Sequence, residues 1–368
     1  MTELWPLLEA WVDINSHTGN HAGCNRMADE LTRAFALPGI TVRRIAGDGS
    51  GDHLAFTTTA WGSRPGTALV GHHDTVFPPG SFEGFRRDDL NVYGPGVLDM
   101  KGGVAIVRTA LSALADVGAL AALPIAVISV ADEETGSVDG RRVIAELARD
   151  ANAGLVFEAG RMTDAIVTRR KGTGKLVVTA HGKPAHAGND LSLGINAIWA
   201  LARFIDRVQL LCASDGTVTV NVGLVAGGTA ANTVPAEARC EIDLRITEPA
   251  QGEPLIAVID RAAREVGDAT GAKLSITGGL RRQPLERLPG TAALVERYAA
   301  AARAEGLQAD EAPLVGGGSD ANTLAALGVP AIDGLGPRGR LFHTPDEFAV
   351  IATFEQRARA LVRYLLAG

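Results

Sequence analysis

The chain has 368 residues, of which 46% are hydrophobic and 21% are charged, and its formal net charge is −7. This length predicts two domains with a sizeable core, and the acidic balance argues against a nucleic-acid partner. No stretch approaches the roughly 20 consecutive apolar residues of a membrane-spanning helix, so we expect no membrane partner.

The N-terminal stretch and the cysteines predict a cytoplasmic protein. The stretch MTELWPLLEAWVDI carries acids and no basic region, so we expect an amphipathic helix there rather than a secretory signal. Cys24, Cys212 and Cys240 are odd in number and lack the spacing of a metal site. We therefore expect a reducing compartment, in which all three thiols are ordinary buried packing.

Alternating strands and helices fill the first 160 residues, as in a parallel α/β sheet. Two helices are expected before residue 38. The elements expected after them are strands at 41–45, 53–58 and 67–71, a helix at 104–115, a strand at 123–130, a helix at 140–149 and a strand at 154–157. The run LPIAVISV at 123–130 is uniformly apolar, which is typical of a buried parallel strand.

The pattern changes after about residue 163 to βαββαβ, the order of a ferredoxin-like module. Its elements are a strand at 175–181, a helix at 195–211, strands at 217–225 and 236–246, a helix at 254–266 and a strand at 273–277. The α/β pattern then resumes with a helix at 292–305, a glycine-rich turn at 316–320, a short strand at 329–332 and a helix at 351–366. We therefore predict an α/β domain with a mixed, mostly parallel sheet flanked by helices (1–164 and 280–368) and an inserted ferredoxin-like α+β domain (165–279).

Polar residues follow two of the predicted strands. His72 and Asp74 share one face of the extended segment after strand 67–71, whereas His73 faces the other way and is the weaker candidate for a site. Glu133 and Glu134 follow strand 123–130 and, by the same alternation, should point in different directions. One of these carboxylates could bind a cation while the other acts as an acid or base.

Three more residues extend this set. Asp99 and Glu158 are expected just past strands of the same sheet, and His343 lies in a loop before the last helix. Each alone is more often a solvated or structural residue, but the carboxyl ends of the strands form the ligand edge of an open α/β sheet. Acids and imidazoles gathered there without basic partners need a cation.

The ligand types favour zinc, with cobalt or manganese as alternatives, because they offer nitrogen and oxygen without thiolate. Two ions about 3.5–4 Å apart could share one carboxylate and activate a water. A nucleotide site is the rival interpretation, since Gly94-Pro95-Gly96 resembles part of a dinucleotide fingerprint. Asp99 stands at the sixth position, where it would repel a pyrophosphate, so a Rossmann-type oxidoreductase is not expected.

Five motifs, in order along the chain, resemble those of the di-zinc exopeptidase/deacylase family, which includes glutamate carboxypeptidase, acetylornithine deacetylase, succinyl-diaminopimelate desuccinylase and aminoacylase. They are His72-x-Asp74-Thr75-Val76, Asp99-Met100-Lys101-Gly102-Gly103, Asp132-Glu133-Glu134-x-Gly136-Ser137, Glu158 and His343. The resemblance covers essentially the whole chain and is closest to the glutamate carboxypeptidase branch. It implies a zinc exopeptidase-like catalytic domain and an inserted lid and dimerisation domain.

The resemblance also implies a set of metal ligands for two Zn²⁺ ions. Asp99 resembles the bridging carboxylate, with His72 and Glu158 completing one metal site and Glu134 and His343 the other. The Asp99–Met100 peptide would be the non-proline cis bond of this family.

Further roles follow from the same resemblance. Glu133 resembles the general base that takes a proton from water and delivers it to the leaving amine, and Asp74 would orient His72. His186 resembles the histidine that reaches the partner subunit's site and polarises the scissile carbonyl. Asn232 and Arg245 resemble the family's ligands of the substrate carboxylate. We also expect Arg282 to help hold that carboxylate and the backbone at Gly317 to line the substrate pocket.

We therefore expect a cytoplasmic, homodimeric, zinc-dependent hydrolase that cleaves an amide next to a free carboxylate. The leading expectation is a carboxypeptidase, of the glutamate type, acting on short peptides or N-acyl amino acids. One alternative keeps the chemistry and changes the substrate to that of a small-molecule N-acyl deacylase. Another is a non-catalytic dimeric relative, which the intact ligand set and Glu133 argue against.

Overall fold

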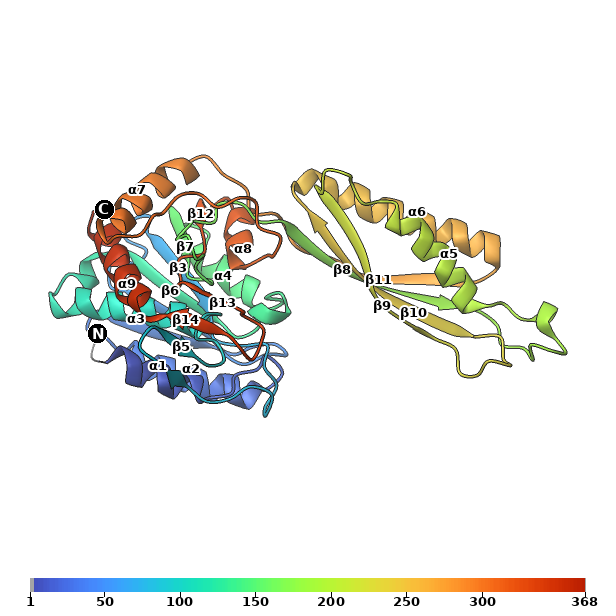
Figure 1. The fold of residues 1–368 in the computed structure, drawn as a ribbon. Helices are drawn as coiled ribbons and strands as arrows, with labels where there is room; N and C mark the ends of the chain where they lie inside the picture. Colours follow the sequence, from blue (N-terminus) through green and yellow to red (C-terminus); the bar gives the residue numbers. More distant parts are fainter. Residues whose placement is uncertain (1–2, 368) are drawn as a thin grey trace. The chain divides into compact units, whose positions relative to one another are not determined.

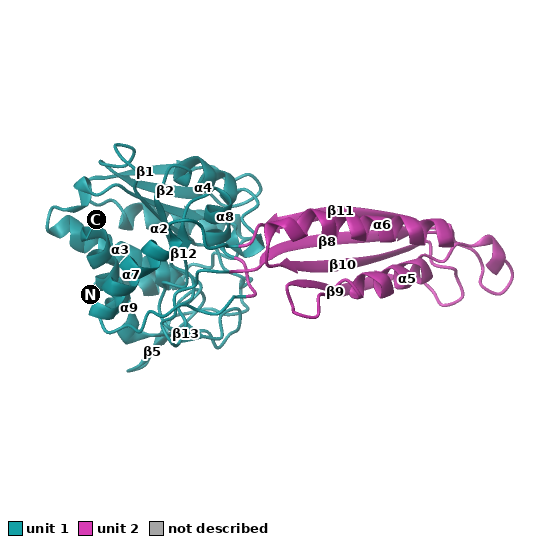
Figure 2. Cartoon of the chain, turned by 90° about the horizontal axis from the view of Figure 1, so that it is seen from above, with its two compact units in different colours: residues 1–169, 285–315, 319–368 teal, residues 170–284, 316–318 magenta. Residues whose placement is uncertain are grey.

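The computed structural model describes residues 3–367, and the chain divides into two compact units (Figure 2). The first comprises Met1–Arg169, Leu285–Val315 and Ser319–Gly368, and the second comprises Arg170–Pro284 and Gly316–Gly318. The second unit is therefore inserted into the sequence of the first. Each unit has its own hydrophobic core.

A six-stranded mixed sheet forms the centre of the first unit. In spatial order its strands are β1 (Ile40–Ile45), β2 (His53–Thr58), β6 (Ile125–Val130), β3 (Thr67–His72), β7 (Ala153–Val156) and β12 (Ala331–Ile332). The last four are parallel neighbours, and β1 and β2 form an antiparallel edge. This confirms the predicted mostly parallel sheet, and it places the carboxyl ends of β6, β3 and β7 along one edge.

Helices cover both faces of this sheet, as Figure 1 shows. One face packs against α1 (Leu4–Val12), α2 (His21–Ala34), α3 (Lys101–Asp116), α7 (Thr291–Ala304) and α9 (Ile351–Leu366), and the other against α4 (Gly140–Ala148) and α8 (Asp320–Ala326). The alternation of side chains along β3 sorts its residues between the two cores. Leu69 belongs to the first core, whereas Ala68 and Val70 belong to the second.

A small four-stranded sheet in the first unit was not expected from the sequence. Its order is β13 (Gly339–Arg340), β14 (Phe348–Val350), β5 (Asn91–Tyr93) and β4 (Arg86–Arg87). Strands of two or three residues are too short to show a hydrophobic period. The pairing of β14 with β5 joins the segment that precedes α3 to the segment that precedes α9.

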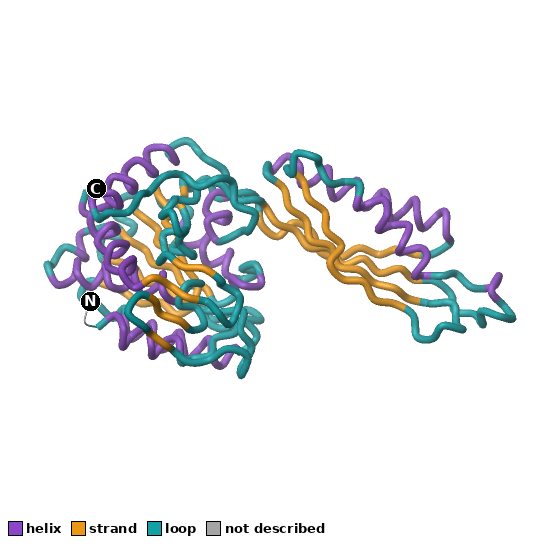
Figure 3. The backbone as a smooth tube through the Cα atoms, in the orientation of Figure 1, coloured by secondary structure: helices purple, strands orange, loops and turns teal. Residues whose placement is uncertain are grey.

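The second unit has the βαββαβ order predicted for a ferredoxin-like fold. Its sheet is antiparallel in the order β11 (Lys273–Arg282), β8 (Gly172–His181), β10 (Glu237–Ile246) and β9 (Val218–Gly227). The helices α5 (Ala197–Gln209) and α6 (Gly252–Thr270) run along one face of this sheet (Figure 3). Buried and partly exposed residues alternate along β8, because one face carries the helices and the other does not.

The fold corrects the expectations for Cys212 and for the glycine-rich turn. Cys212 is exposed rather than buried, because it lies after the end of α5, where its Sγ contacts the backbone of Val220. The helix α8 directly follows the glycine-rich turn, where no helix was expected. Ser319 begins it, accepting the backbone N–H of Ala321 in a capping box with Asn322.

Within residues 3–367, no helix combines the length and apolar character needed to cross a bilayer.

Candidate metal centre

Three adjacent strand ends position the core of the candidate site. His72 is the last residue of β3, and Glu133 and Glu134 lie in η2 (Glu133–Thr135), a 3₁₀ turn that follows β6. Glu158 follows β7 by two residues. Because β6, β3 and β7 are neighbours, with His72 paired opposite Val130, these side chains meet at one edge of the sheet.

The segment of Glu133 and Glu134 is a turn, not the extended segment expected from the sequence. The backbone N–H groups of both residues donate to the Asp74 carboxylate, at 3.1 and 3.2 Å. Glu134 Oε2 lies 3.2 Å from His343 Nε2, while the Glu133 carboxylate is grouped with His72 and Glu158. Both glutamates therefore reach the centre from a turn rather than from an extended segment, and each belongs to a different group of ligand atoms around His72.

Asp99 was expected to follow a strand of the central sheet. It lies instead between the small sheet's strand β5 and helix α3. Its peptide bond to Met100 is cis, as the resemblance implied. Asp99 Oδ1 lies 3.2 Å from His72 Nε2, and Oδ2 lies 3.3 Å from His343 Nε2. One carboxylate thus presents one oxygen to each of two histidines, which is the arrangement that a bridging ligand requires.

The neighbouring histidines take different positions. His72 Nδ1 lies 3.0 Å from the backbone oxygen of Asp74, so a proton there leaves the Nε2 lone pair facing Asp99. His73 instead points to Ser129 Oγ, at 2.8 Å, and burial lowers the pKa of His73 to about 3. The geometry therefore favours His72 over His73 as the imidazole of the centre.

The donor set fits metal ions. Ligand atoms of His72, Asp99 and Glu134 lie within 4.8 Å of one another, and so do those of His72, Glu133 and Glu158. The donors are nitrogen and oxygen, as zinc, cobalt and manganese accept. In addition, Glu134 Oε1 is buried and has no hydrogen-bond partner among residues 3–367.

The electrostatics of the cluster also favour a cation. Burial, and after it the charge of Asp99, raises the pKa of Glu134 to about 8 and that of Glu158 well above its usual value. Hydrogen bonds to Asp99 and Glu134 raise the pKa of His343 to about 10. The ion-pair partners of these acids in the described chain are histidines. The centre therefore holds more carboxylates than neighbouring cations can neutralise.

Asp74 is a fully buried carboxylate that connects several parts of the centre. Besides the two N–H groups of η2, its Oδ1 lies 3.3 Å from His72 Nδ1, and its Oδ2 accepts a 2.6 Å hydrogen bond from Thr18 Oγ1. Burial opposes ionisation, but the hydrogen bonds from His72 and Thr18 outweigh it and lower the pKa of Asp74. Asp74 therefore holds both the imidazole of His72 and the backbone that carries Glu133 and Glu134.

We expect Asp74→Ala to weaken metal binding by about 10- to 100-fold, as loss of a partner of a metal ligand usually does. The physical reason is that His72 Nδ1 loses the Asp74 carboxylate at 3.3 Å, although it keeps the backbone oxygen of residue 74, and that η2 loses two backbone hydrogen bonds at once. Competition with a chromophoric chelator measures the effect. Thr18→Val is the matched control, because it removes one hydrogen bond to Asp74 and should change the metal dissociation constant far less. Equal effects of the two substitutions would contradict this role.

The candidate substrate groups all belong to the second unit, where they form two sets. His186 and Asn232 lie on adjoining loops, since Ala187 N–H donates to Asn232 O and His186 forms a β-bridge with Thr233. His186 is exposed, and its Nδ1 accepts the N–H groups of Gly188 and Asn189, both at 3.2 Å.

The second set lies around the Gly316–Gly318 segment. Arg245 Nη1 donates to Gly316 O at 3.4 Å, and its Nε and Nη2 bind both carboxylate oxygens of Asp243. Arg170 Nη1 donates to Gly317 O at 3.0 Å. A Cβ added at Gly318 would lie 3.4 Å from Cδ of Arg282. Arg245, Arg282 and Gly317 are therefore neighbours.

The two sets stand at opposite ends of the sheet of the second unit. On β10, Glu237 pairs with His181 and Arg245 pairs with Thr173, so the β8 strand runs from one set to the other. A ten-residue strand spans roughly 30 Å. A single inserted domain therefore cannot bring His186 and Arg245 to one small substrate.

Two residues of the centre were missed by sequence reasoning. Thr18 supplies a hydrogen bond to Asp74 from the start of the chain, and no local pattern marks it. Glu347 is fully buried and accepts the N–H groups of Leu98 and Asp99. The sequence signal that could have identified Glu347 was its position four residues after His343.

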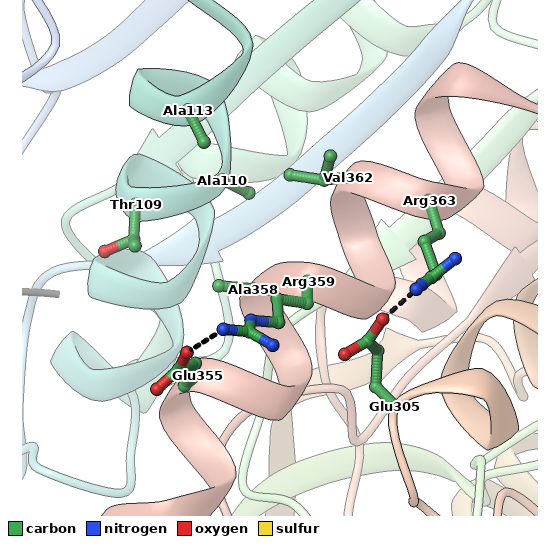
Figure 4. A pocket seen from close by; sticks show the side chains of 9 residues that line it. All are labelled: Thr109, Ala110, Ala113, Glu305, Glu355, Ala358, Arg359, Val362 and Arg363. Atoms are coloured by element: carbon green, nitrogen blue, oxygen red, sulfur yellow. Dashed lines mark hydrogen bonds and ion pairs between the residues drawn. The ribbon is translucent and has the colours of Figure 1, made fainter. Parts of the chain in front are cut away.

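A separate pocket of about 450 Å³ lies between α3 and α9 (Figure 4). Ala110, Ala113 and Val362 supply apolar surface, and ion pairs of Arg359 with Glu355 and of Arg363 with Glu305 stand beside them. The candidate metal ligands lie outside this lining. The pocket offers paired charges and methyl groups rather than the donors that hydrolysis needs.

Comparison with known proteins agrees with the geometry. Residues 68–367 match the model of peptidase family M20/M25/M40. Carboxypeptidase G2 from Pseudomonas sp. (strain RS-16) is 27% identical over 366 residues, covering 98% of this chain and 88% of the relative. A succinyl-diaminopimelate desuccinylase from Sphingopyxis alaskensis is 30% identical over 362 residues, covering 92% and 91%.

Solved structures show the same fold. A tripeptidase from Staphylococcus aureus aligns with a TM-score of 0.82 at 24% identity, covering 99% of this chain and 97% of that one. The M20 metallo-carboxypeptidase Sso-CP2 from Sulfolobus solfataricus aligns with a TM-score of 0.80 at 16% identity, covering 99% of both chains. The family match covers most of the chain, including every candidate metal ligand. The chain therefore belongs to peptidase family M20/M25/M40 and is a metal-dependent hydrolase.

Proposed function

We propose that the protein is a zinc-dependent carboxypeptidase that cleaves the amide bond next to a free carboxylate, on short peptides or N-acyl amino acids. The observation that carries the proposal is the Asp99 carboxylate, which faces His72 with one oxygen and His343 with the other. Glu133 stands beside this arrangement as a buried carboxylate. The similarity to carboxypeptidase G2 along nearly the whole chain supports the carboxypeptidase activity.

Two Zn²⁺ ions are the proposed cofactors, with Co²⁺ or Mn²⁺ as alternatives. Asp99 would bridge them, His72 and Glu158 would hold one, and Glu134 and His343 would hold the other. When bound, such a pair of ions supplies Lewis acidity and lowers the pKa of a water.

Glu133 is the proposed general base and acid. Its carboxylate would accept a proton from the attacking water and then deliver that proton to the nitrogen of the leaving amine. The backbone N–H of Glu133 donates to Asp74 at 3.1 Å, which holds the turn that carries this side chain. Ligand atoms of Glu133, His72 and Glu158 lie within 4.8 Å of one another, and the variants described in the Discussion distinguish a base from a metal ligand at position 133.

The substrate carboxylate is proposed to bind Arg282 through paired hydrogen bonds, with the Gly317 backbone lining the substrate pocket. Arg245 is proposed to bind it as well, and its Nε and Nη2 would then exchange Asp243 for the substrate. His186 and Asn232 lie at the other end of the same unit, so we propose that they serve the site of a partner subunit. His186 would then polarise the scissile carbonyl.

A homodimer through the inserted unit is part of this proposal. The edge strand β9 exposes Leu224 and Val225, and the neighbouring helix α5 exposes Ile198 and Trp199. An open strand edge with exposed apolar side chains is a favourable surface for a second copy. A cytoplasmic location is also proposed, because Cys24, Cys212 and Cys240 are free thiols, as is usual in a reducing compartment.

An N-acyl deacylase is the second candidate, because the S. alaskensis desuccinylase is 30% identical along 91% of its length. Both candidates cleave an amide beside a carboxylate, so the metal centre cannot distinguish them. The difference lies in which side of the scissile bond carries the recognised group.

A hydrolysis screen with released amine as readout tests the proposal. The panel contains dipeptides and N-acyl amino acids ending in Glu, Asp or a neutral residue, N-succinyl-diaminopimelate, and matched compounds whose carboxylate is amidated. We expect the C-terminal glutamate compounds to be cleaved, with kcat/KM lower by about 100-fold or more after amidation. Preference for N-succinyl-diaminopimelate would select the deacylase, and equal cleavage of free and amidated compounds would contradict carboxylate recognition.

A further inference from the structure

Glu347 is a fully buried acid beside the candidate metal centre that has no role in the chemistry described above. Its Oε1 accepts the backbone N–H of Leu98 at 2.8 Å and that of Asp99 at 3.1 Å. Almost 250 residues separate Glu347 from these partners along the chain. One oxygen atom therefore fixes the backbone from which the Asp99 carboxylate projects.

The same residue ends the loop that carries His343. The backbone N–H of Glu347 donates to Thr344 O at 3.1 Å, and Thr344 N–H donates to Leu341 O at 3.1 Å. Leu341 and His343 both have positive φ, at 64° and 65°, which side-chain-bearing residues adopt only when their surroundings hold them. The loop conformation thus depends on contacts outside it.

Two further contacts join the loops of Asp99 and His343. The β14 strand, which begins one residue after Glu347, pairs with β5, which precedes Asp99. At the site itself, His343 Nε2 lies 3.3 Å from Asp99 Oδ2. Glu347 lies between these two contacts and connects the backbones directly.

We propose that Glu347 is a positioning residue that holds the Asp99 carboxylate in register with His343 and so sets the affinity of the centre for metal. This inference rests on the metal centre proposed above. Glu347 acts through backbone N–H groups and does not itself supply a ligand. Its function requires an oxygen acceptor at this place.

The acceptor, rather than the negative charge, is the required feature. Oε1 of Glu347 receives the backbone N–H groups of Leu98 and Asp99, and a neutral acceptor can receive both of them. The second oxygen, Oε2, is buried and has no hydrogen-bond partner within the described part of the chain. A glutamine keeps the acceptor oxygen, whereas a methionine of similar volume removes it and leaves two buried N–H groups without a partner.

The test compares zinc dissociation constants of the full-length wild type, Glu347→Gln and Glu347→Met by competition with a chromophoric chelator. We expect Glu347→Met to bind zinc about 10- to 100-fold more weakly, as loss of a residue that orients a ligand does. Glu347→Gln should stay within about threefold of the wild type. In steady-state assays at limiting zinc, kcat should fall with site occupancy while KM is unchanged.

Asp88→Ala is the matched control. Asp88 Oδ1 also accepts two backbone N–H groups, from Leu90 at 2.8 Å and Asn91 at 2.7 Å, but in an exposed loop. Its loss should leave zinc affinity unchanged. Melting of the metal-free proteins by circular dichroism separates loss of fold from loss of affinity. If Glu347→Met does not fold, Glu347→Asp replaces it, because the shorter side chain withdraws the oxygen but keeps the charge.

The outcomes are distinct. A folded Glu347→Met or Glu347→Asp protein with wild-type zinc affinity would overturn the inference, and so would a Glu347→Gln protein as weak as the methionine variant. A wild type that binds no zinc would instead refute the proposed metal centre itself.

Discussion

Glu133→Gln should lower kcat by about 10²- to 10⁴-fold, the usual contribution of a general acid–base group, while the protein keeps its metal. Glutamine has nearly the shape of glutamate but cannot accept the proton of the attacking water. The turn that positions the side chain is held through its backbone by Asp74, so the substitution should leave the structure in place. Metal content by plasma emission spectroscopy and steady-state rates on the same sample give both quantities.

The adjacent Glu134→Gln variant is the matched control for this experiment. Glu134 Oε2 lies 3.2 Å from His343 Nε2, and its other oxygen is buried, so its loss should reduce metal content along with activity. The two variants change the same chemical group one residue apart. If Glu133→Gln loses metal as readily as Glu134→Gln does, Glu133 is a ligand rather than the base.

Asp99→Ala should have the largest effect on metal binding. Loss of a residue that orients a ligand typically lowers metal affinity about 10- to 100-fold, and Asp99→Ala should lower it by more. Within residues 3–367, Asp99 is the carboxylate that forms ion pairs with both His72 and His343, so its removal separates the two halves of the centre. It also leaves Glu134 and Glu158 without the acid whose charge raises their pKa values. Activity should fall to that of chelator-treated wild type, and added zinc should restore little of it.

Asp139→Ala is the control for Asp99→Ala, because it removes another nearly buried acid paired with a histidine. Asp139 Oδ2 lies 3.0 Å from His53 Nε2, and Arg142 and the Asp48 N–H complete its contacts. This substitution should lower thermal stability and leave metal content near that of the wild type. Loss of metal in Asp139→Ala but not in Asp99→Ala would remove Asp99 from its proposed bridging position.

The sequence predicted those parts of the molecule that a local pattern encodes. The apolar run of β6 and the βαββαβ order of the inserted unit are long enough to show their periods, and the structure confirms both. The convergence of His72, Glu134 and Glu158 followed from the rule that ligands gather at the carboxyl ends of parallel strands. The structure places these side chains together.

Other features depended on contacts between distant segments. The small sheet that joins the Asp99 and His343 segments has strands of two or three residues, which carry no period. The buried position of Glu347 follows from pairing across that sheet, so its sequence context gave only its distance from His343. Glu133 and Glu134 were expected on an extended segment, because the hydrogen bonds from Asp74 that stabilise their turn come from another strand end.

In the inserted unit, too, some features follow from local sequence patterns and others depend on contacts between distant segments. Its fold was predictable from alternation, but the separation of His186 and Asn232 from Arg245 follows from strand register, which pairs Glu237 with His181 and Arg245 with Thr173. Sequence motifs give no distance between such groups. Exposure of Cys212 likewise depends on where α5 ends, and element boundaries are the least certain part of a sequence-based prediction.

A zinc titration of metal-free protein, with bound metal and amide hydrolysis recorded together, tests the proposed metal centre. Two ions shared by one carboxylate are expected to bind, so activity should rise to its maximum as occupancy approaches about two zinc per chain. The same titration of Asp99→Ala should show neither binding nor activity in that range. Full activity in wild-type protein that remains free of metal would contradict the proposed centre.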